Sequence, residues 1–107
     1  MEHLGLTKMI KVEVVVAGGD AAAVRDQIEA AGARGFTSLS RVSGLGHHGY
    51  HEGGILFNEQ DSLTLIITVV PEDAAEGLVT GLRVLLERSA GVMFVSDTYV
   101  SRPEYFR

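Results

Sequence analysis

Cysteine is absent from the 107-residue sequence, and positive charge is scarce. The lack of cysteine excludes disulfide bonds, thiolate catalysis and cysteine-based zinc sites. The 9 lysine and arginine residues are outnumbered by 14 aspartate and glutamate residues, which gives a formal net charge of −5. This balance argues against nucleic acid and against an anionic membrane surface as partners, because both require clustered basic side chains.

Long apolar runs are missing as well. No stretch approaches the roughly 20 apolar residues of a membrane-spanning helix, and residues 1–11 lack the apolar segment of a signal peptide. We therefore expect a cytoplasmic protein without membrane insertion. The length and the 46% hydrophobic fraction predict a single domain over residues 1–107 with a substantial core.

Hydrophobic patterning predicts strands separated by helices. The expected strands cover residues 8–17, 35–43, 62–70 and 92–100. The expected helices run from about residue 20 to 31 and from about residue 73 to 89. Asp20 is placed to cap the first helix with its carboxylate, and Asp73 with Glu76 resembles a capping box for the second.

The resulting order, β-α-β followed by β-α-β, predicts an α+β fold of the ferredoxin-like type. In this arrangement an antiparallel sheet carries both helices on one face. The strand at residues 62–70 has apolar side chains on both faces, so the helix-free face of the sheet needs cover. We expect a homo-oligomer, in which other copies of the chain bury this face.

Glycine and histidine are concentrated in residues 44–61, where no periodicity remains. Such a segment is expected to form a long loop, and long loops in small domains usually carry function. His47, His48 and His51 could bind a divalent metal, since imidazoles are common zinc and copper ligands. Their spacing fits no regular element, so we favour a loop whose histidines contact a nucleotide or an anion when it orders.

The sequence offers no recognisable catalytic arrangement. No paired carboxylates occur at a spacing suited to hydrolysis, and no nucleophile-elbow motif is present. An acylphosphatase-like enzyme would need an arginine and an asparagine around a phosphate loop, and Gly18, Gly19 and Asp20 offer neither. We therefore expect a binding protein and not an enzyme.

Short motifs in a fixed order indicate a family. Val24-Arg25 is followed by Gly35-Phe36-Thr37 and by Gly44-Leu45-Gly46. Farther along come Ile67-Thr68-Val69-Val70-Pro71-Glu72-Asp73 and Phe94-Val95-Ser96-Asp97. Together these motifs, which span about residues 9–102, resemble the PII signal-transduction family.

The resemblance implies a homotrimer that holds an adenine nucleotide in clefts between subunits and signals to a protein target through a long loop. That loop, the T-loop, matches residues 44–61, and residues 101–107 form a C-terminal tail that is loosely ordered or docked on a neighbour. The implied nucleotide-binding residues are Thr37, Gly44, Leu45, Gly46, His47, His48, Gly91, Val92, Phe94 and Arg102.

The same resemblance assigns roles to some of these positions. Thr37 would meet the adenine or the ribose, and Arg102 would reach phosphate, for which its guanidinium fork is suited. Gly44 and Gly46 form the base of the T-loop. Because glycine has no Cβ, backbone amides there can approach an anion closely.

The sequence departs from the family at its phosphate-binding loop. The basic, glycine-rich B-loop is reduced to Ser89-Ala90-Gly91, and Val92 stands where the family has a lysine. His47 and His48 occupy positions where the family has arginine and glutamine. These features resemble the PII-like branch of bacterial inorganic-carbon metabolism, which includes carboxysome-associated PII proteins. That branch implies ADP or AMP as the ligand, with bicarbonate beside it, and no required cofactor.

A divalent-metal tolerance protein is the alternative function. That family shares the trimeric ferredoxin-like fold, and the ligands here would be His47, His48 and His51. The absence of cysteine weighs against copper as the metal.

Overall fold

A computed structural model describes residues 1–46, 49–51 and 62–107. Its strands are β1 (Thr7–Ala17), β2 (Thr37–Val42), β3 (Gly44–Gly46), β4 (Gly49–His51), β5 (Leu63–Val70) and β6 (Val92–Val100). Its helices are α1 (Ala21–Ala30) and α2 (Glu72–Leu86), with 3-10 turns η1 (Glu2–Leu4), η2 (Gly18–Asp20) and η3 (Pro103–Tyr105).

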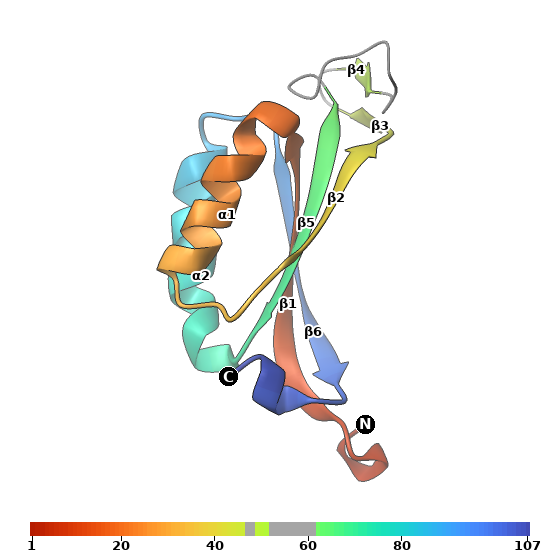
Figure 1. The fold of residues 1–107 in the computed structure, drawn as a ribbon, viewed down its shortest axis with the longest axis vertical. Helices are drawn as coiled ribbons and strands as arrows, with labels where there is room; N and C mark the ends of the chain where they lie inside the picture. The colour runs from red at the N-terminus through yellow and green to blue at the C-terminus, as the bar shows by residue number, and fades with distance from the viewer. Residues whose placement is uncertain (47–48, 52–61) are drawn as a thin grey trace.

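Four strands form one antiparallel sheet in the order β2-β5-β1-β6. Both helices lie on the same face of this sheet, and the opposite face carries no helix (Figure 1). We call that second face the open face. The predicted α+β ferredoxin-like arrangement is confirmed, and the four expected strands agree with the observed ones to within two residues at each end.

The core lies between the sheet and the helices. Val12, Val14 and Val16 alternate along β1 and are completely buried against the helices, as the strand pattern predicts. The same cluster contains Val24, Ile28, Ile66, Val70, Leu78 and Leu82. Burial of a side chain of this size contributes about 1.5–3 kcal/mol, so this face of the sheet supplies most of the hydrophobic stabilisation.

The predicted helix caps are wrong. Asp20 stands at the N-cap position of α1, but its side chain makes no capping hydrogen bond, because turn η2 leads directly into the helix. Helix α2 begins at Glu72 after Pro71, whose extended backbone occupies the N-cap position. Asp73 therefore already lies inside the first turn, and a capping box with Glu76 cannot form.

The expected loop over residues 44–61 begins as a small hairpin. Strands β3 and β4 pair antiparallel, with Gly44 opposite His51 and Gly46 opposite Gly49. The chain enters this hairpin through an irregularity of β2 at Arg41, whose φ of 60° is uncommon for a residue with a side chain. Residues 47–48 and 52–61 of the expected loop lie outside the described part of the chain.

Among the described residues, no helix combines the length and the apolar character needed to cross a membrane.

Candidate functional site

Two ends of the sheet carry most of the predicted site. We call the end of the sheet next to residues 44–61 the loop end, and the opposite end, next to residues 101–107, the tail end. At the loop end, Val42 of β2 pairs with Leu63, which in turn pairs with Ala17. The base of the predicted T-loop follows Val42, and Val92 at the start of β6 pairs with Val15, so both lie at this end. At the tail end, Val100 pairs with Thr7.

Arg102 follows β6 at the tail end, far from the predicted residues of the loop end. Strand β6 has nine residues, and a strand rises about 3.3 Å per residue. Gly91 and Arg102, which flank this strand, are therefore roughly 30 Å apart within one chain. One small ligand cannot touch both residues of the same chain.

Thr37 and Phe94 lie between these two ends, in one row across the open face. Thr37 pairs with Ile67, Ile67 pairs with Glu13, and Glu13 pairs with Phe94. The row crosses all four strands, so Thr37 and Phe94 are about 14 Å apart at the usual spacing of about 4.8 Å between strands. Phe94 is 57% exposed in the single chain, which is unusual for a phenylalanine in the middle of a strand.

Arg102 is exposed and already has one partner. Its Nη1 donates a hydrogen bond of 2.9 Å to the Tyr105 hydroxyl, and its Cζ lies 5.6 Å from the centroid of the Tyr105 ring. Pro103 starts the turn η3 that brings Tyr105 back over Arg102. The contact fixes one edge of the guanidinium and leaves its other N–H groups available to an anion.

The C-terminal tail is held on its own chain. Arg34, in the connection between α1 and β2, donates a 2.7 Å hydrogen bond from Nη1 to the backbone carbonyl of Arg107. The tail was expected to be loose or docked on a neighbour, and this contact ties its last residue to the tail end of the domain. Sequence patterns carried no signal for Arg34 or Tyr105, since both contacts depend on the fold of the tail.

Gly91 is a packing position as well as a predicted site residue. A Cβ at Gly91 would overlap Cγ1 of the buried Val16 and would lie 2.9 Å from the backbone oxygen of Val15. The Gly91 N–H donates a 2.9 Å hydrogen bond to Oγ of Ser89. The short connection from α2 to β6 can therefore pass close to β1 only because residue 91 has no side chain.

Charges at the tail end are paired across three elements. The Lys8 ammonium lies 3.3 Å from Oε1 of Glu72 and 3.6 Å from Oδ2 of Asp97. The hydrogen bond with Glu72, and then the charge of Asp97, raise the pKa of Lys8 above its ordinary value of 10.5. Lys8 thus stays charged at neutral pH and ties β1 to the start of α2 and to β6.

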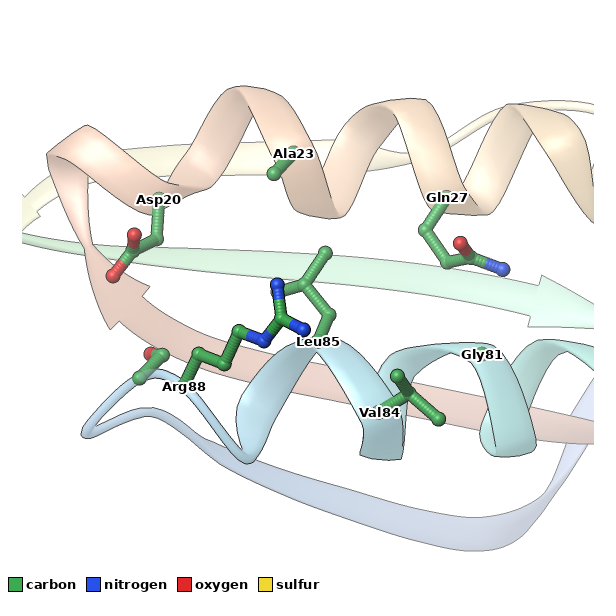
Figure 2. A pocket seen from close by; sticks show the side chains of 8 residues that line it. Asp20, Ala23, Gln27, Gly81, Val84, Leu85 and Arg88 are labelled. Atoms are coloured by element: carbon green, nitrogen blue, oxygen red, sulfur yellow. The ribbon is translucent and has the colours of Figure 1, made fainter.

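A separate groove lies between the helices, away from the open face. It has a volume of about 390 Å³ and runs along the seam of α1 and α2, with Asp20 and Arg88 on its two walls (Figure 2). None of the predicted nucleotide-binding residues lines it. One residue in the sequence does indicate a close approach on this helix: Gly81 interrupts the interior of a leucine-rich helix.

The histidine cluster of the alternative, metal-binding function lies largely outside the described residues. His47 and His48 lie outside the described residues, and only the backbone of His51 is described. In the described ranges no three histidine, aspartate or glutamate residues come close enough together to hold a metal ion.

The domain is a small ferredoxin-like fold whose single-chain structure leaves one face of the sheet without helices. The family model described as nitrogen regulatory protein P-II matches residues 9–105. The chain therefore belongs to the P-II family of regulatory signalling proteins.

Solved structures of CPII, a PII-like protein of Thiomonas intermedia K12, are similar to this chain. A complex of CPII with ADP, AMP and bicarbonate has 38% sequence identity and a TM-score of 0.87, over 95% of this chain and 96% of CPII. A complex with ADP and bicarbonate has 35% identity and a TM-score of 0.84, over 95% and 97% of the two chains.

A PII-like signalling protein of Thermus thermophilus has 18% identity and a TM-score of 0.79, over 95% of this chain and 98% of its own. That likeness supports the fold alone. Among curated proteins, none matches this chain.

Proposed function

We propose that this protein is a homotrimeric signalling protein that binds ADP or AMP in clefts between its subunits, with bicarbonate as a second ligand. It acts in the cytoplasm in inorganic-carbon metabolism, catalyses no reaction, and signals to a protein target through the order of residues 44–61. The observation that carries the proposal is the division of the predicted nucleotide-binding residues between opposite ends of one chain.

That division is explained if each cleft is built from two chains. Gly91 and the T-loop base of one subunit would form one wall, and Thr37 or Arg102 of the next subunit would form the other. Each wall alone offers few contacts, so binding would depend on assembly. The trimeric organisation that the family resemblance implies provides such clefts.

The open face supports the same assembly. Leu39, Val92 and Phe94 are 49%, 49% and 57% exposed there, and Leu65 and Ile67 of β5 are only half-buried. Leu39 pairs with Leu65, Leu65 with Val15, and Val15 with Val92, so an apolar row crosses all four strands on this face. Exposed apolar surface of this kind is typical of a subunit interface. Burial of these faces against one another would complete the core on the second side of the sheet.

The ligand assignment rests on the relatives and on the short connection before β6. The similar CPII structures hold ADP, AMP and bicarbonate. In this chain Val92 is apolar and Ser89-Ala90-Gly91 carries no cation, so this short connection offers no charged contact to a third phosphate. A diphosphate or a monophosphate therefore suits these residues better than a triphosphate.

Replacement of Arg102 by alanine tests this assignment. A charge-assisted contact to phosphate contributes about 1.5–3 kcal/mol, so we expect Arg102→Ala to weaken ADP binding roughly 10- to 100-fold and to leave adenosine unaffected. Tyr105→Phe, which keeps the ring but removes the hydroxyl that holds the guanidinium, should cause a smaller loss. Isothermal titration calorimetry measures all of these affinities.

Arg83→Ala is the matched control, because Arg83 is an exposed arginine on α2 outside the proposed site. It should leave ADP binding unchanged. The placement of the phosphate site is refuted if Arg102→Ala binds ADP like the wild type. The ligand assignment is refuted if ATP with Mg²⁺ binds far more tightly than ADP.

A further inference from the structure

The open face of the sheet carries one ion pair within an otherwise uncharged surface. Side chains alternate along β1, so Lys11 and Glu13 lie on the open face while Val12 and Val14 point into the core. Among the strand residues whose pairing the structure describes, Lys11 and Glu13 are the only charged ones on this face. Since β1 has a neighbouring strand on each side, the pair lies in the interior of the face and not at its rim.

The surroundings of this pair do little to stabilise its charges. Nζ of Lys11 lies 3.4 Å from Oε1 of Glu13, and the two side chains are only 36% and 29% exposed in the single chain. Phe94 and Ile67 flank Glu13 on the two neighbouring strands. Neither charged side chain makes another ion pair or hydrogen bond with a described residue. The ammonium and the carboxylate therefore keep unused hydrogen-bonding capacity, which solvent can satisfy only while the face is uncovered.

We propose that Lys11 of each subunit pairs with Glu13 of the next subunit, and that this contact selects which chains assemble. The proposal rests on the trimer proposed above, in which the open face is the interface. Assembly there removes water from both charges, and a buried ion pair is tolerated only when further partners satisfy it. The described residues of the same chain provide none, so the partners come from the neighbouring copy.

The signs of the two charges determine which surface can cover them. A purely apolar surface would leave both charges unsatisfied, and a surface of one sign would match only one of them. A second copy of the chain presents both signs at the same spacing. In a closed ring each Lys11 then lies between its own Glu13 and that of a neighbour, so all charges balance.

The test is a mixing experiment with the double variant Lys11→Glu/Glu13→Lys. This charge swap keeps the ion pair within each chain, so the variant should fold and form trimers with its own copies. Beside a wild-type subunit it would place two ammonium groups at one contact and two carboxylates at the other. We therefore expect trimers that contain both chains to be at least about tenfold rarer than random mixing gives, because like charges across an interface are strongly unfavourable.

Native mass spectrometry measures the composition of the trimers. The wild type is ¹⁵N-labelled, because the swap leaves the mass of the chain unchanged, and the two proteins are unfolded in urea and refolded together. Glu76→Arg/Arg83→Glu is the matched control, since it exchanges two exposed charges on α2, on the helical face. This control should mix with the wild type at random.

The single variants Lys11→Glu and Glu13→Lys provide a second test that does not need the double variant. Each alone should assemble more weakly than the wild type. A mixture of the two should form mixed trimers in preference to pure ones, which a pair confined to one chain does not predict.

Random mixing of the charge-swapped variant with a trimeric wild type overturns the proposal. So does a folded charge-swapped variant that stays monomeric, or a mixture of the single variants without preference for mixed trimers. A wild type that is itself monomeric refutes the trimer proposed above, which separates failure of that proposal from failure of this one.

Discussion

Phe94→Lys is expected to convert the proposed homotrimer into monomers. Phe94 lies on the open face, on the edge strand β6, and is 57% exposed in the single chain. Its burial between subunits would contribute about 1.5–3 kcal/mol in each copy, and a lysine there would instead bring a charge into the interface. The single chain should tolerate the change, because Phe94 pairs across the strands with Glu13, which offers the lysine an opposite charge.

Size-exclusion chromatography with light scattering measures this effect, and calorimetry with ADP measures its consequence for binding. The variant should lose ADP binding, because neither wall of a cleft is complete alone and because Phe94 is itself among the predicted nucleotide-binding residues. Val84→Lys is the matched control, because Val84 is also 57% exposed but lies on the helical face. A trimer that persists in Phe94→Lys would show that the open face is not the interface.

Gly91→Ala is expected to cause the largest loss of folding stability among single methyl additions at the described glycines. The added Cβ would collide with Cγ1 of Val16 and with the backbone oxygen of Val15. Val16 is completely buried and the backbone of β1 is held by strands on both sides, so neither atom can move aside cheaply. Overpacking of this kind costs about 1–3 kcal/mol.

Gly77→Ala is the control for this prediction. Nothing lies within 4 Å of a Cβ at Gly77, and the residue is exposed within α2. Alanine should therefore stabilise the protein there by up to about 1 kcal/mol through its higher helix propensity. Urea denaturation at a fixed protein concentration measures both changes. Equal stability of Gly91→Ala and the wild type would contradict the close approach of this segment to β1.

The fold could be predicted from the sequence because its signals are local. Val12, Val14 and Val16 alternate along one strand, and this alternation requires one covered face whatever the neighbouring strands are. The helix caps were predicted wrongly for the opposite reason. Asp73 has a strong preference for a cap, but Pro71 starts the helix earlier, and the composition of the segment does not reveal which of the two prevails.

Only part of the candidate site could be predicted from the sequence. Family motifs predicted Thr37 and Phe94 as site residues, which stays a prediction, but their common row depends on strand register, which periodicity does not determine. The hairpin of β3 and β4 was missed because glycine and histidine give no alternation of apolar residues. The packing role of Gly91 depends on contact with Val16, which is distant in the sequence, and no local pattern indicates it.

The distance between Gly91 and Arg102 within one chain has a genetic consequence. In the proposed trimer each cleft joins the loop end of one subunit to the tail end of the next. Suppose that one subunit is defective at its tail end and another at its loop end. A mixed trimer of the two then contains one cleft made only of intact halves, and that cleft would bind the ligand. Two inactive alleles of this gene, expressed together, would complement each other within a single assembly.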